Sequence, residues 1–301
     1  FISRPPFSVE NPMIPGNFEL NILPGFKCGF RCAHCAVGPE LETEARLSQD
    51  EIRLLKKTIL EFRPATLAFA GGEPTYYIDE INELVSAHPA PEKLTVRLTT
   101  NGQFAQDEAR ALSTLRAFRK LDQVQLSYDR FHEDYFPLQK VGHVASACKT
   151  LSMDFGVLLA MTSPLDLEIA GRLRAHGDFP ITASKVLPVG DAIANNVAYR
   201  HIEFDPKVLA ERCPNLGQMS YICGRGFTLC CSSLAFNGSR DGVVHPTLPE
   251  HIESPLFKSM SEYNFSDLLA RSGIQIDSLA PDMSSACTLC EHIFCKETKQ
   301  P

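Results

Sequence analysis

Short apolar runs alternate with helical patterns along the first two thirds of the chain. The runs predicted to be strands are residues 18–23, 66–70, 94–98, 123–127, 155–161 and 181–187. Between them, apolar residues recur every three or four positions, which is typical of helices that face a core. The predicted helices begin after Ser48 and lie near 77–87, 106–120, 140–151 and 165–175. Alternation of this kind predicts parallel strands joined by right-handed crossovers.

The start of the first helix carries a recognisable signal. Ser48 and Glu51 form a capping-box pair, in which each side chain can accept a hydrogen bond from the backbone of the other. Ile52, Leu55 and Ile59 then share one helical face. We therefore expect this helix to begin at residue 49 and to cover the sheet.

Six strand–helix units are too few to close an eight-stranded barrel. The sequence therefore predicts an α/β fold with an open, partial (β/α)6 barrel over residues 18–200. The Pro-punctuated residues 1–17 are predicted to form an N-terminal arm. Residues 201–301 lose the alternation, contain turn signals and hold seven of the eleven cysteines, so we expect a second, smaller domain there. In such barrels the chemistry lies on the loops that follow the strands.

Charge and composition narrow the classes of partner. The net charge is -7 and no Lys/Arg-rich run is present, which argues against nucleic acid or an anionic membrane as the partner and favours a small molecule or a peptide. No apolar run reaches the length of a membrane helix, and no signal segment is visible. We expect a soluble, cytoplasmic protein. The clustered cysteines then indicate metal binding rather than disulfides.

Three of these cysteines, Cys28, Cys32 and Cys35, lie in the loop after the first predicted strand, here called the cysteine loop (residues 26–38). Three thiols cannot all pair as disulfides. His34 adjoins Cys35 and is poorly placed to complete a zinc site with it, although a distant histidine could do so. A structural role is a further alternative. The fourth is an iron–sulfur cluster with three thiolate ligands and one open iron.

The spacing Cys28-x3-Cys32-x2-Cys35, followed by Gly-Gly-Glu-Pro after the second strand, resembles the signature of the radical S-adenosylmethionine superfamily, and the resemblance extends over residues 18–200. It implies a 4Fe-4S cluster whose open iron binds the amino and carboxylate groups of S-adenosylmethionine. One-electron reduction, from a donor such as flavodoxin or ferredoxin, would then yield a 5'-deoxyadenosyl radical. His34 departs from the aromatic or aliphatic residue usual at that position.

The resemblance also implies a set of cofactor contacts on the loops after strands two, three, four and six. The residues concerned are Gly71, Gly72, Glu73, Pro74, Thr100, Asn101, Ser127, Asp129 and Lys185. For the polar residues the alternatives are a helix cap, a turn or a solvated side chain. His132 could contact substrate or act as an acid or base, or could simply hydrogen-bond within its loop.

The cysteines beyond residue 200 resemble the auxiliary-cluster module called the twitch domain, a shortened SPASM domain, over roughly residues 205–295. The implied ligands of a second 4Fe-4S cluster are Cys213, Cys231, Cys287 and Cys290, with Cys295 as a possible replacement for Cys290. A zinc ribbon with four thiolates is the alternative. Cys223 and Cys230 are left over, either as hydrogen-atom donors to a substrate radical or as inert buried thiols.

These resemblances predict an oxidoreductase of the radical S-adenosylmethionine type with two clusters. The expected substrate is a ribosomally made peptide that is cross-linked, oxidised or epimerised. A small polyol or aminosugar, dehydrogenated or epimerised, is the alternative substrate. A non-catalytic zinc protein is the alternative from another class.

Overall fold

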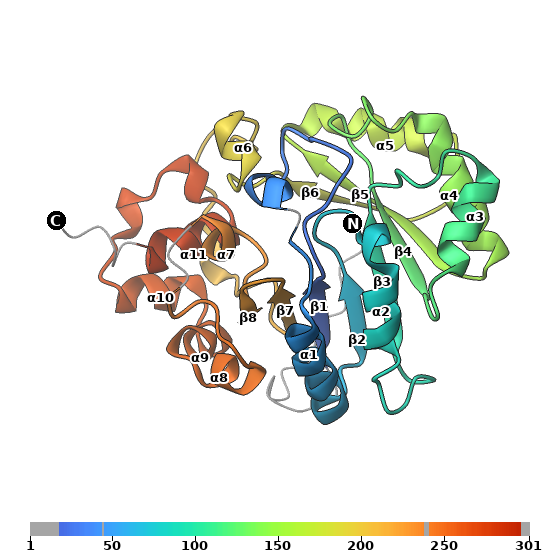
Figure 1. The fold of residues 1–301 in the computed structure, drawn as a ribbon. Helices are drawn as coiled ribbons and strands as arrows, with labels where there is room; N and C mark the ends of the chain where they lie inside the picture. Colours follow the sequence, from blue (N-terminus) through green and yellow to red (C-terminus); the bar gives the residue numbers. More distant parts are fainter. Residues whose placement is uncertain (1–17, 44, 238–240, 296–301) are drawn as a thin grey trace.

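A single eight-stranded sheet forms the centre of the molecule (Figure 1). The computed structural model describes residues 18–43, 45–237 and 241–295, so the predicted arm over 1–17 lies outside the described residues. The strand order is β6-β5-β4-β3-β2-β1-β7-β8, and every pairing except β7–β8 is parallel. The protein therefore has an α/β fold with a mostly parallel sheet.

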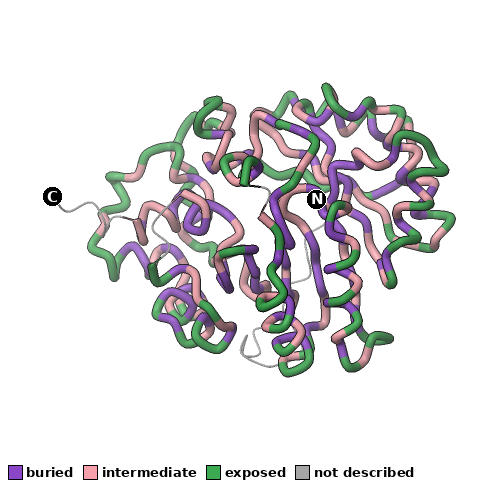
Figure 2. The backbone as a smooth tube through the Cα atoms, in the orientation of Figure 1, coloured by how far each residue is buried: buried purple, intermediate pink, exposed green. Residues whose placement is uncertain are grey.

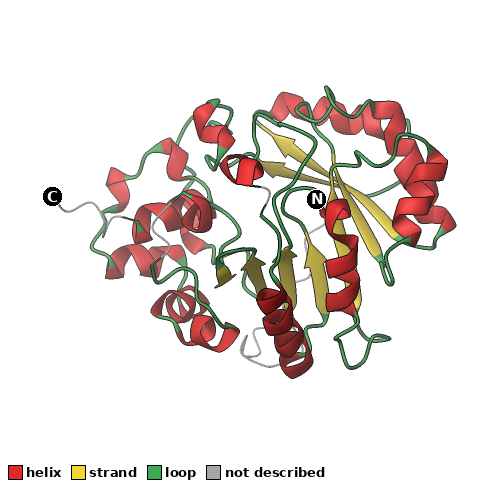
Figure 3. Cartoon of the chain, viewed as in Figure 1, coloured by secondary structure: helices red, strands yellow, loops and turns green. Residues whose placement is uncertain are grey.

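The six predicted strands are confirmed, with small shifts at their ends. They are β1 Glu19–Leu23, β2 Thr66–Phe69, β3 Thr95–Thr100, β4 Gln123–Ser127, β5 Asp154–Met161 and β6 Ile181–Lys185. The helices between them are α1 Gln49–Phe62, α2 Ile78–Val85, α3 Glu108–Arg116, α4 Val141–Thr150 and α5 Leu167–Arg174. Helices lie outside the sheet in Figure 3, and the buried segments of Figure 2 include much of β1 to β4, whereas β6 at the edge is mostly exposed.

Helix α1 begins as predicted. The Ser48 hydroxyl accepts from the backbone N–H of Glu51 at 3.3 Å, and the Glu51 carboxylate accepts from the backbone N–H of Ser48 at 2.8 Å. Ile52, Leu55 and Ile59 are all buried. Local sequence therefore sets both the start of this helix and the face that it presents to the sheet.

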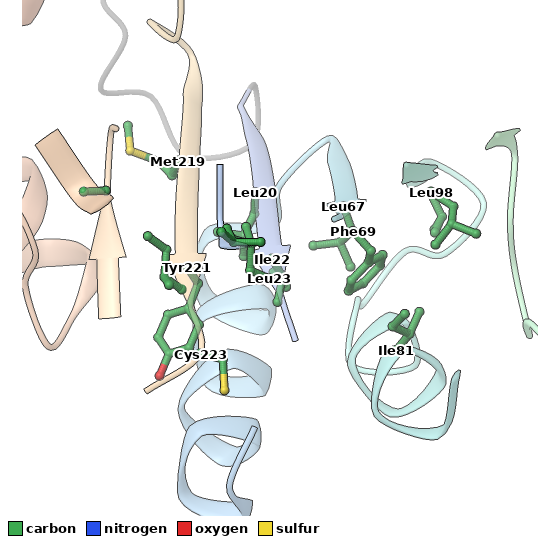
Figure 4. Close-up of a cluster of buried hydrophobic side chains, with 14 of the residues drawn as sticks. Leu20, Ile22, Leu23, Leu67, Phe69, Ile81, Leu98, Met219, Tyr221 and Cys223 are labelled. Carbon is green, nitrogen blue, oxygen red and sulfur yellow. The ribbon is translucent and has the colours of Figure 1, made fainter. Parts of the chain in front are cut away.

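Two further strands extend the sheet where only loops and turns were expected. They are β7 Gln218–Ile222, parallel to β1, and β8 Gly226–Thr228, antiparallel to β7. Met219 and Tyr221 of β7 lie beside Leu20 and Ile22 of β1 in the apolar cluster of Figure 4. The chain beyond residue 200 thus shares the sheet of the first part, and the predicted boundary at residue 200 stays a prediction.

Short helices make up most of the remaining described chain. They are α6 Asp191–Ala194, α7 Ser233–Phe236, α8 Leu248–Glu253, α9 Pro255–Glu262, α10 Phe265–Arg271 and α11 Ala286–Phe294. Helices α7 to α11 gather beside the β8 edge, at the left of Figure 1. In the described part of the chain, β6 and β8 end the strand order, so the sheet stays open. No helix described is long and apolar enough to cross a membrane.

Candidate functional site

The predicted site residues follow the carboxyl ends of adjacent parallel strands. The cysteine loop follows β1, Gly71 to Pro74 follow β2, and Thr100 with Asn101 ends β3 and begins the next loop. Ser127 ends β4, and Lys185 ends β6. Because β1 to β6 are parallel neighbours, all these loops lie at one edge of the sheet. The topology therefore brings the sequence motifs together.

The Gly-Gly pair lets the cysteine loop pack against the loop after β2. The Glu73 N–H donates to the Lys27 carbonyl at 2.7 Å. A Cβ on Gly72 would lie 2.4 Å from that carbonyl oxygen and 2.6 Å from the carbonyl carbon of Phe26. Gly71 has φ +120°, in the region that glycine favours. Glycine is thus required here for backbone packing, whereas its predicted contact with a cofactor stays a prediction.

Glu73 is fully buried and joins the ends of β2 and β3. Its carboxylate accepts from the hydroxyls of Thr100 at 2.7 Å and Thr75 at 2.8 Å, and from the Asn101 N–H at 2.9 Å. Burial raises the pKa of Glu73, while these donors favour the charged carboxylate. Pro74 then starts a short 3-10 helix that Glu73 caps. Both carboxylate oxygens already accept bonds from the chain, so Glu73 fixes the two loops relative to each other.

Asn101 connects this anchor to the cysteines. Its side-chain amide donates to the sulfur of Cys28 at 3.3 Å, and the Phe30 N–H approaches the same sulfur at 3.4 Å. Burial raises the pKa of the Cys28 thiol, and both donors lower it. The two donors therefore stabilise a thiolate at Cys28, the form that binds metal.

The three cysteines of the loop are thiols placed close together but not at the spacing of a single ion. Cys32 is buried, Cys28 and Cys35 are half-buried, and none forms a disulfide. Burial, with a smaller effect from Cys28, raises the pKa of Cys35 to about 11. Zinc with thiolates at about 2.3 Å needs sulfurs about 3.8 Å apart. Within the described residues, no three cysteine sulfurs lie within 4.8 Å of one another. The donor set fits a cluster in which each thiolate binds its own iron.

The segment after β6 supports the cysteine loop from the other side, through residues that were not predicted. The Asp191 N–H donates to the Cys35 carbonyl at 3.0 Å. A Cβ on Gly190, whose φ is +58°, would lie 2.6 Å from that carbonyl oxygen. The Asn195 amide donates to the Ala33 carbonyl at 3.1 Å. The signal that could have identified them is the Val-Gly-Asp sequence at residues 189–191, in the loop that follows β6.

Asp129 and His132 lie together on the loop after β4, beside His34 of the cysteine loop. His132 Nδ1 is 2.9 Å from Asp129 Oδ1, and His34 Nε2 is 3.5 Å from Asp129 Oδ2. Burial alone would raise the pKa of Asp129, but bonding and charge from His132 and His34 hold it below its ordinary value. Ser127 is half-buried, and its predicted cofactor contact stays a prediction.

Lys185 lies on a cleft between β6 and α11. The cleft has a volume of about 370 Å³, and Tyr199, His201, Ser285 and Thr288 also line it. The Lys185 ammonium is 4.9 Å from the centre of the Tyr199 ring. Burial lowers the pKa of His201, and the Lys185 charge lowers it further. Lys185 and Arg200 therefore present positive charge, beside the carboxylate of Asp282, to a space large enough for part of a small molecule.

The second group of cysteines surrounds a small apolar cavity of about 30 Å³. Its cysteine lining consists of Cys213, Cys230, Cys287 and Cys290. Cys231 does not line it, and its sulfur accepts from the Asn215 amide at 3.3 Å. Burial raises the pKa of Cys213 and Cys287 to about 12. The structure thus brings Cys230, left over in the sequence analysis, into the group.

The two remaining cysteines of the C-terminal part differ in surroundings. Cys295 follows α11, and its charge is among the causes that raise the pKa of Cys290, so the two lie near each other. Cys223 follows β7, is 2% exposed, and donates its backbone N–H to Leu23 at 3.1 Å. Its thiol lies beside α1 in Figure 4. The predicted hydrogen-atom transfer from Cys223 or Cys230 stays a prediction.

The match to a protein-family model lies in the first half of the chain. Residues 22–149 match the model of the Radical SAM superfamily. A Probable GTP 3',8-cyclase of Methanococcus maripaludis (strain C5) is 30% identical over 135 residues, which is 44% of this chain and 43% of that protein. A GTP 3',8-cyclase of Listeria monocytogenes serotype 4b is 30% identical over 115 residues, covering 36% and 33%. The chain spans less than half the length of these relatives.

Two solved structures are similar over longer stretches but at low identity. Streptococcus suis SuiB bound to S-adenosylmethionine has 13% identity and a TM-score of 0.45, covering 92% of this chain and 78% of that one. BtrN in complex with AdoMet and 2-DOIA has 11% identity and a TM-score of 0.42, covering 72% and 74%. Neither likeness bears on activity. Residues 22–149, which carry the cysteine loop, the Gly-Gly-Glu-Pro turn and the Asp129 loop, are the part of the chain that matches the Radical SAM superfamily domain.

Proposed function

We propose that this chain is a radical S-adenosylmethionine oxidoreductase that acts on a small anionic substrate and uses a second cluster for electron transfer. The observation that carries the proposal is the match to the superfamily over residues 22–149, with three thiols and no single-ion spacing at the start of that domain. S-adenosylmethionine and one 4Fe-4S cluster are the cofactors expected of such a domain. A cytoplasmic location and a flavodoxin- or ferredoxin-like donor remain predictions.

Each group of residues has a part in the proposed reaction. When bound, the cluster would pass on one electron from an external donor, and this would cleave S-adenosylmethionine into methionine and a 5'-deoxyadenosyl radical able to remove a hydrogen atom from the substrate. Cys28, Cys32 and Cys35 would hold this cluster, and Asn101 would stabilise the Cys28 thiolate through its 3.3 Å bond. Glu73 holds the loops after β2 and β3 together, so the site is preorganised before the cofactor binds.

The substrate class follows from the cleft between β6 and α11. Lys185 lines it and suits a phosphate or carboxylate. Ser285 and Thr288 of the same cleft flank Cys287 in the sequence, so a substrate there would lie close to the second cysteine group. This arrangement supports electron transfer between substrate and a second cluster. No comparable structural feature supports the peptide substrate predicted from the sequence, so the peptide stays a prediction. The polyol and the aminosugar stay predictions too.

The ligands proposed for the second cluster are Cys213, Cys230, Cys287 and Cys290, because these four line one cavity. Cys230 here replaces Cys231 of the sequence-based set. The cavity is otherwise lined mostly by apolar residues, which would exclude water from the cluster. Thiols with raised pKa values must lose protons on metal binding, so loading should be favoured at high pH.

Anaerobic purification with iron analysis tests the proposal. We expect about eight irons per chain and formation of 5'-deoxyadenosine from S-adenosylmethionine. Cys32→Ala should abolish that cleavage, Cys287→Ala should keep it with about four irons fewer, and Cys148→Ala, in the core of α4, is the control. A colourless chain that contains zinc at both cysteine groups would refute the proposal that the chain is a radical S-adenosylmethionine enzyme.

Titration with GTP, the nucleotide in the relatives' names, tests the anionic cleft. Lys185→Ala should weaken binding about tenfold or more, since it removes one charge-assisted contact. Lys207→Ala, a lysine outside the cleft, should leave binding unchanged. Equal affinity in both variants would contradict a role for Lys185, and no binding by the wild type would remove nucleotides as the class.

A further inference from the structure

Two histidines and an aspartate converge between the cysteine loop and the end of β4. One potential ligand atom each from His34, Asp129 and His132 lies within 4.8 Å of the other two. Across the described residues, no other three histidine, cysteine or acidic side chains come this close. Asp129 is 1% exposed and His132 is 6% exposed. The group is therefore a local feature of the fold rather than a chance meeting of surface side chains.

The surrounding contacts hold each side chain in place. The Phe131 N–H donates to Asp129 Oδ1 at 2.9 Å, which closes a turn directly after β4. The backbone N–H of His132 donates to the backbone carbonyl of Asp129 at 3.0 Å, and this bond keeps His132 close to the Asp129 side chain. His34 stacks on the Phe131 ring with centroids 4.6 Å apart. Packing and the turn, rather than mutual attraction alone, thus fix the three side chains.

Hydrogen bonding leaves this group incompletely satisfied. His132 Nδ1 faces Asp129 Oδ1 at 2.9 Å, whereas His34 Nδ1 is buried without a hydrogen-bond partner. Buried polar atoms in this state cost about 1–3 kcal/mol each. A buried cluster of two imidazoles and one carboxylate with an unmet polar atom is a candidate for binding an ion.

The separations agree with a shared ion. Ligands bonded at about 2.0–2.2 Å lie about 2.9 Å apart at a right angle and about 3.4 Å apart in a tetrahedron. His132 Nδ1 is 2.9 Å from Oδ1 of Asp129, and His34 Nε2 is 3.5 Å from its other oxygen, Oδ2, so one ion bound by all three side chains would lie against the carboxylate edge that both imidazoles face. Two imidazoles and one carboxylate suit zinc, iron(II) or manganese, and they do not suit calcium or magnesium, which prefer oxygen ligands.

We propose that His34, Asp129 and His132 bind one divalent transition-metal ion, separate from the iron of the cysteine loop. Three protein ligands leave open positions, so the ion could hold an oxygen of a substrate or cofactor beside the radical site. This assigns Asp129 and His132, predicted from the sequence as a cofactor contact and a catalytic residue, to an ion. The proposal uses none of the cysteines and can fail independently of the proposed function.

Metal analysis of the cluster-loaded full chain tests the site. The protein is incubated anaerobically with Mn²⁺, desalted, and assayed for manganese and iron. We expect about one manganese per chain, lost in His132→Ala and Asp129→Asn, with affinity reduced more than about 100-fold while iron is retained. His143→Ala, a half-buried histidine of α4, is the matched control and should keep the ion.

Spectroscopy of the wild-type protein keeps the test valid if a variant misfolds. Electron spin-echo modulation of bound Mn²⁺ should show nitrogen-14 coupling from imidazole. Absence of manganese in the wild type, absence of nitrogen coupling, or an unchanged manganese content in folded, iron-loaded His132→Ala and Asp129→Asn proteins would each overturn the proposal. Loss of manganese on replacing Cys28, Cys32 and Cys35 by alanine, with His132→Ala unaffected, would place the ion on the thiols and overturn it as well.

Discussion

Gly72→Ala should destabilise the protein and impair the cysteine loop, although it adds only one methyl group. The new Cβ would lie 2.4 Å from the Lys27 carbonyl oxygen, whereas ordinary contact begins near 3.4 Å. The two backbone segments must therefore separate by about 1 Å. That separation stretches the Glu73–Lys27 bond, now 2.7 Å, and the Gly72–Gly25 bond, now 3.0 Å.

The expected magnitude combines strain with these weakened bonds. Overpacking costs about 1–3 kcal/mol, and each weakened backbone bond adds about 0.5–1.5 kcal/mol. With two such bonds, we expect a net loss of about 2–6 kcal/mol in the free energy of unfolding. Because the strain falls on the backbone that leads to Cys28, iron content should fall too.

Gly171→Ala is the matched control. Gly171 lies exposed within α5, and no atom lies within 4 Å of a Cβ built there. Alanine should stabilise this helix by about 0.5–1 kcal/mol. Urea unfolding of the metal-free chains measures both free energies, and iron analysis measures cluster loading. If Gly72→Ala has the same free energy of unfolding and the same iron content as the parent, the close approach of the two backbones cannot be the reason for glycine at this position.

Three further predictions concern buried groups. Glu73→Gln places an amide donor among the donors that now face Glu73, and should cost about 1–3 kcal/mol in urea unfolding; an unchanged midpoint would contradict the network around Asn101. Burial, with a smaller effect from a neighbouring histidine, lowers the pKa of His251 to about 4, so the unfolded chain binds a proton first as pH falls below 6.5. Stability should therefore drop by about 2 kcal/mol between pH 7 and pH 5, and His251→Gln should flatten that slope. Finally, Cys230→Ala should remove about four irons and Cys231→Ala should not, and the reverse result would restore the sequence-based ligand set.

Local sequence patterns were sufficient to predict the first six strands and the start of α1. A strand such as β2 is a short apolar run, and the Ser48–Glu51 cap involves residues three apart, so neither depends on distant parts of the chain. The order of the parallel strands then determined that the cysteine loop, Glu73 and Asn101 would lie at one edge. The spacing of the three cysteines, with the Gly-Gly-Glu-Pro turn, was enough to indicate the superfamily whose model residues 22–149 match.

Tertiary structure alone decided the features that depend on distant pairing. Strand β7 joins β1 although about two hundred residues separate them, and its Gln-Met-Ser-Tyr-Ile sequence has no clear period that would predict a partner. The choice of Cys230 over Cys231 as a cavity residue depends on which of two adjacent side chains faces α11. His34 and Asp129 meet across the gap between two loops. Sequence sets local conformation, but only packing determines which side chains of separate loops converge.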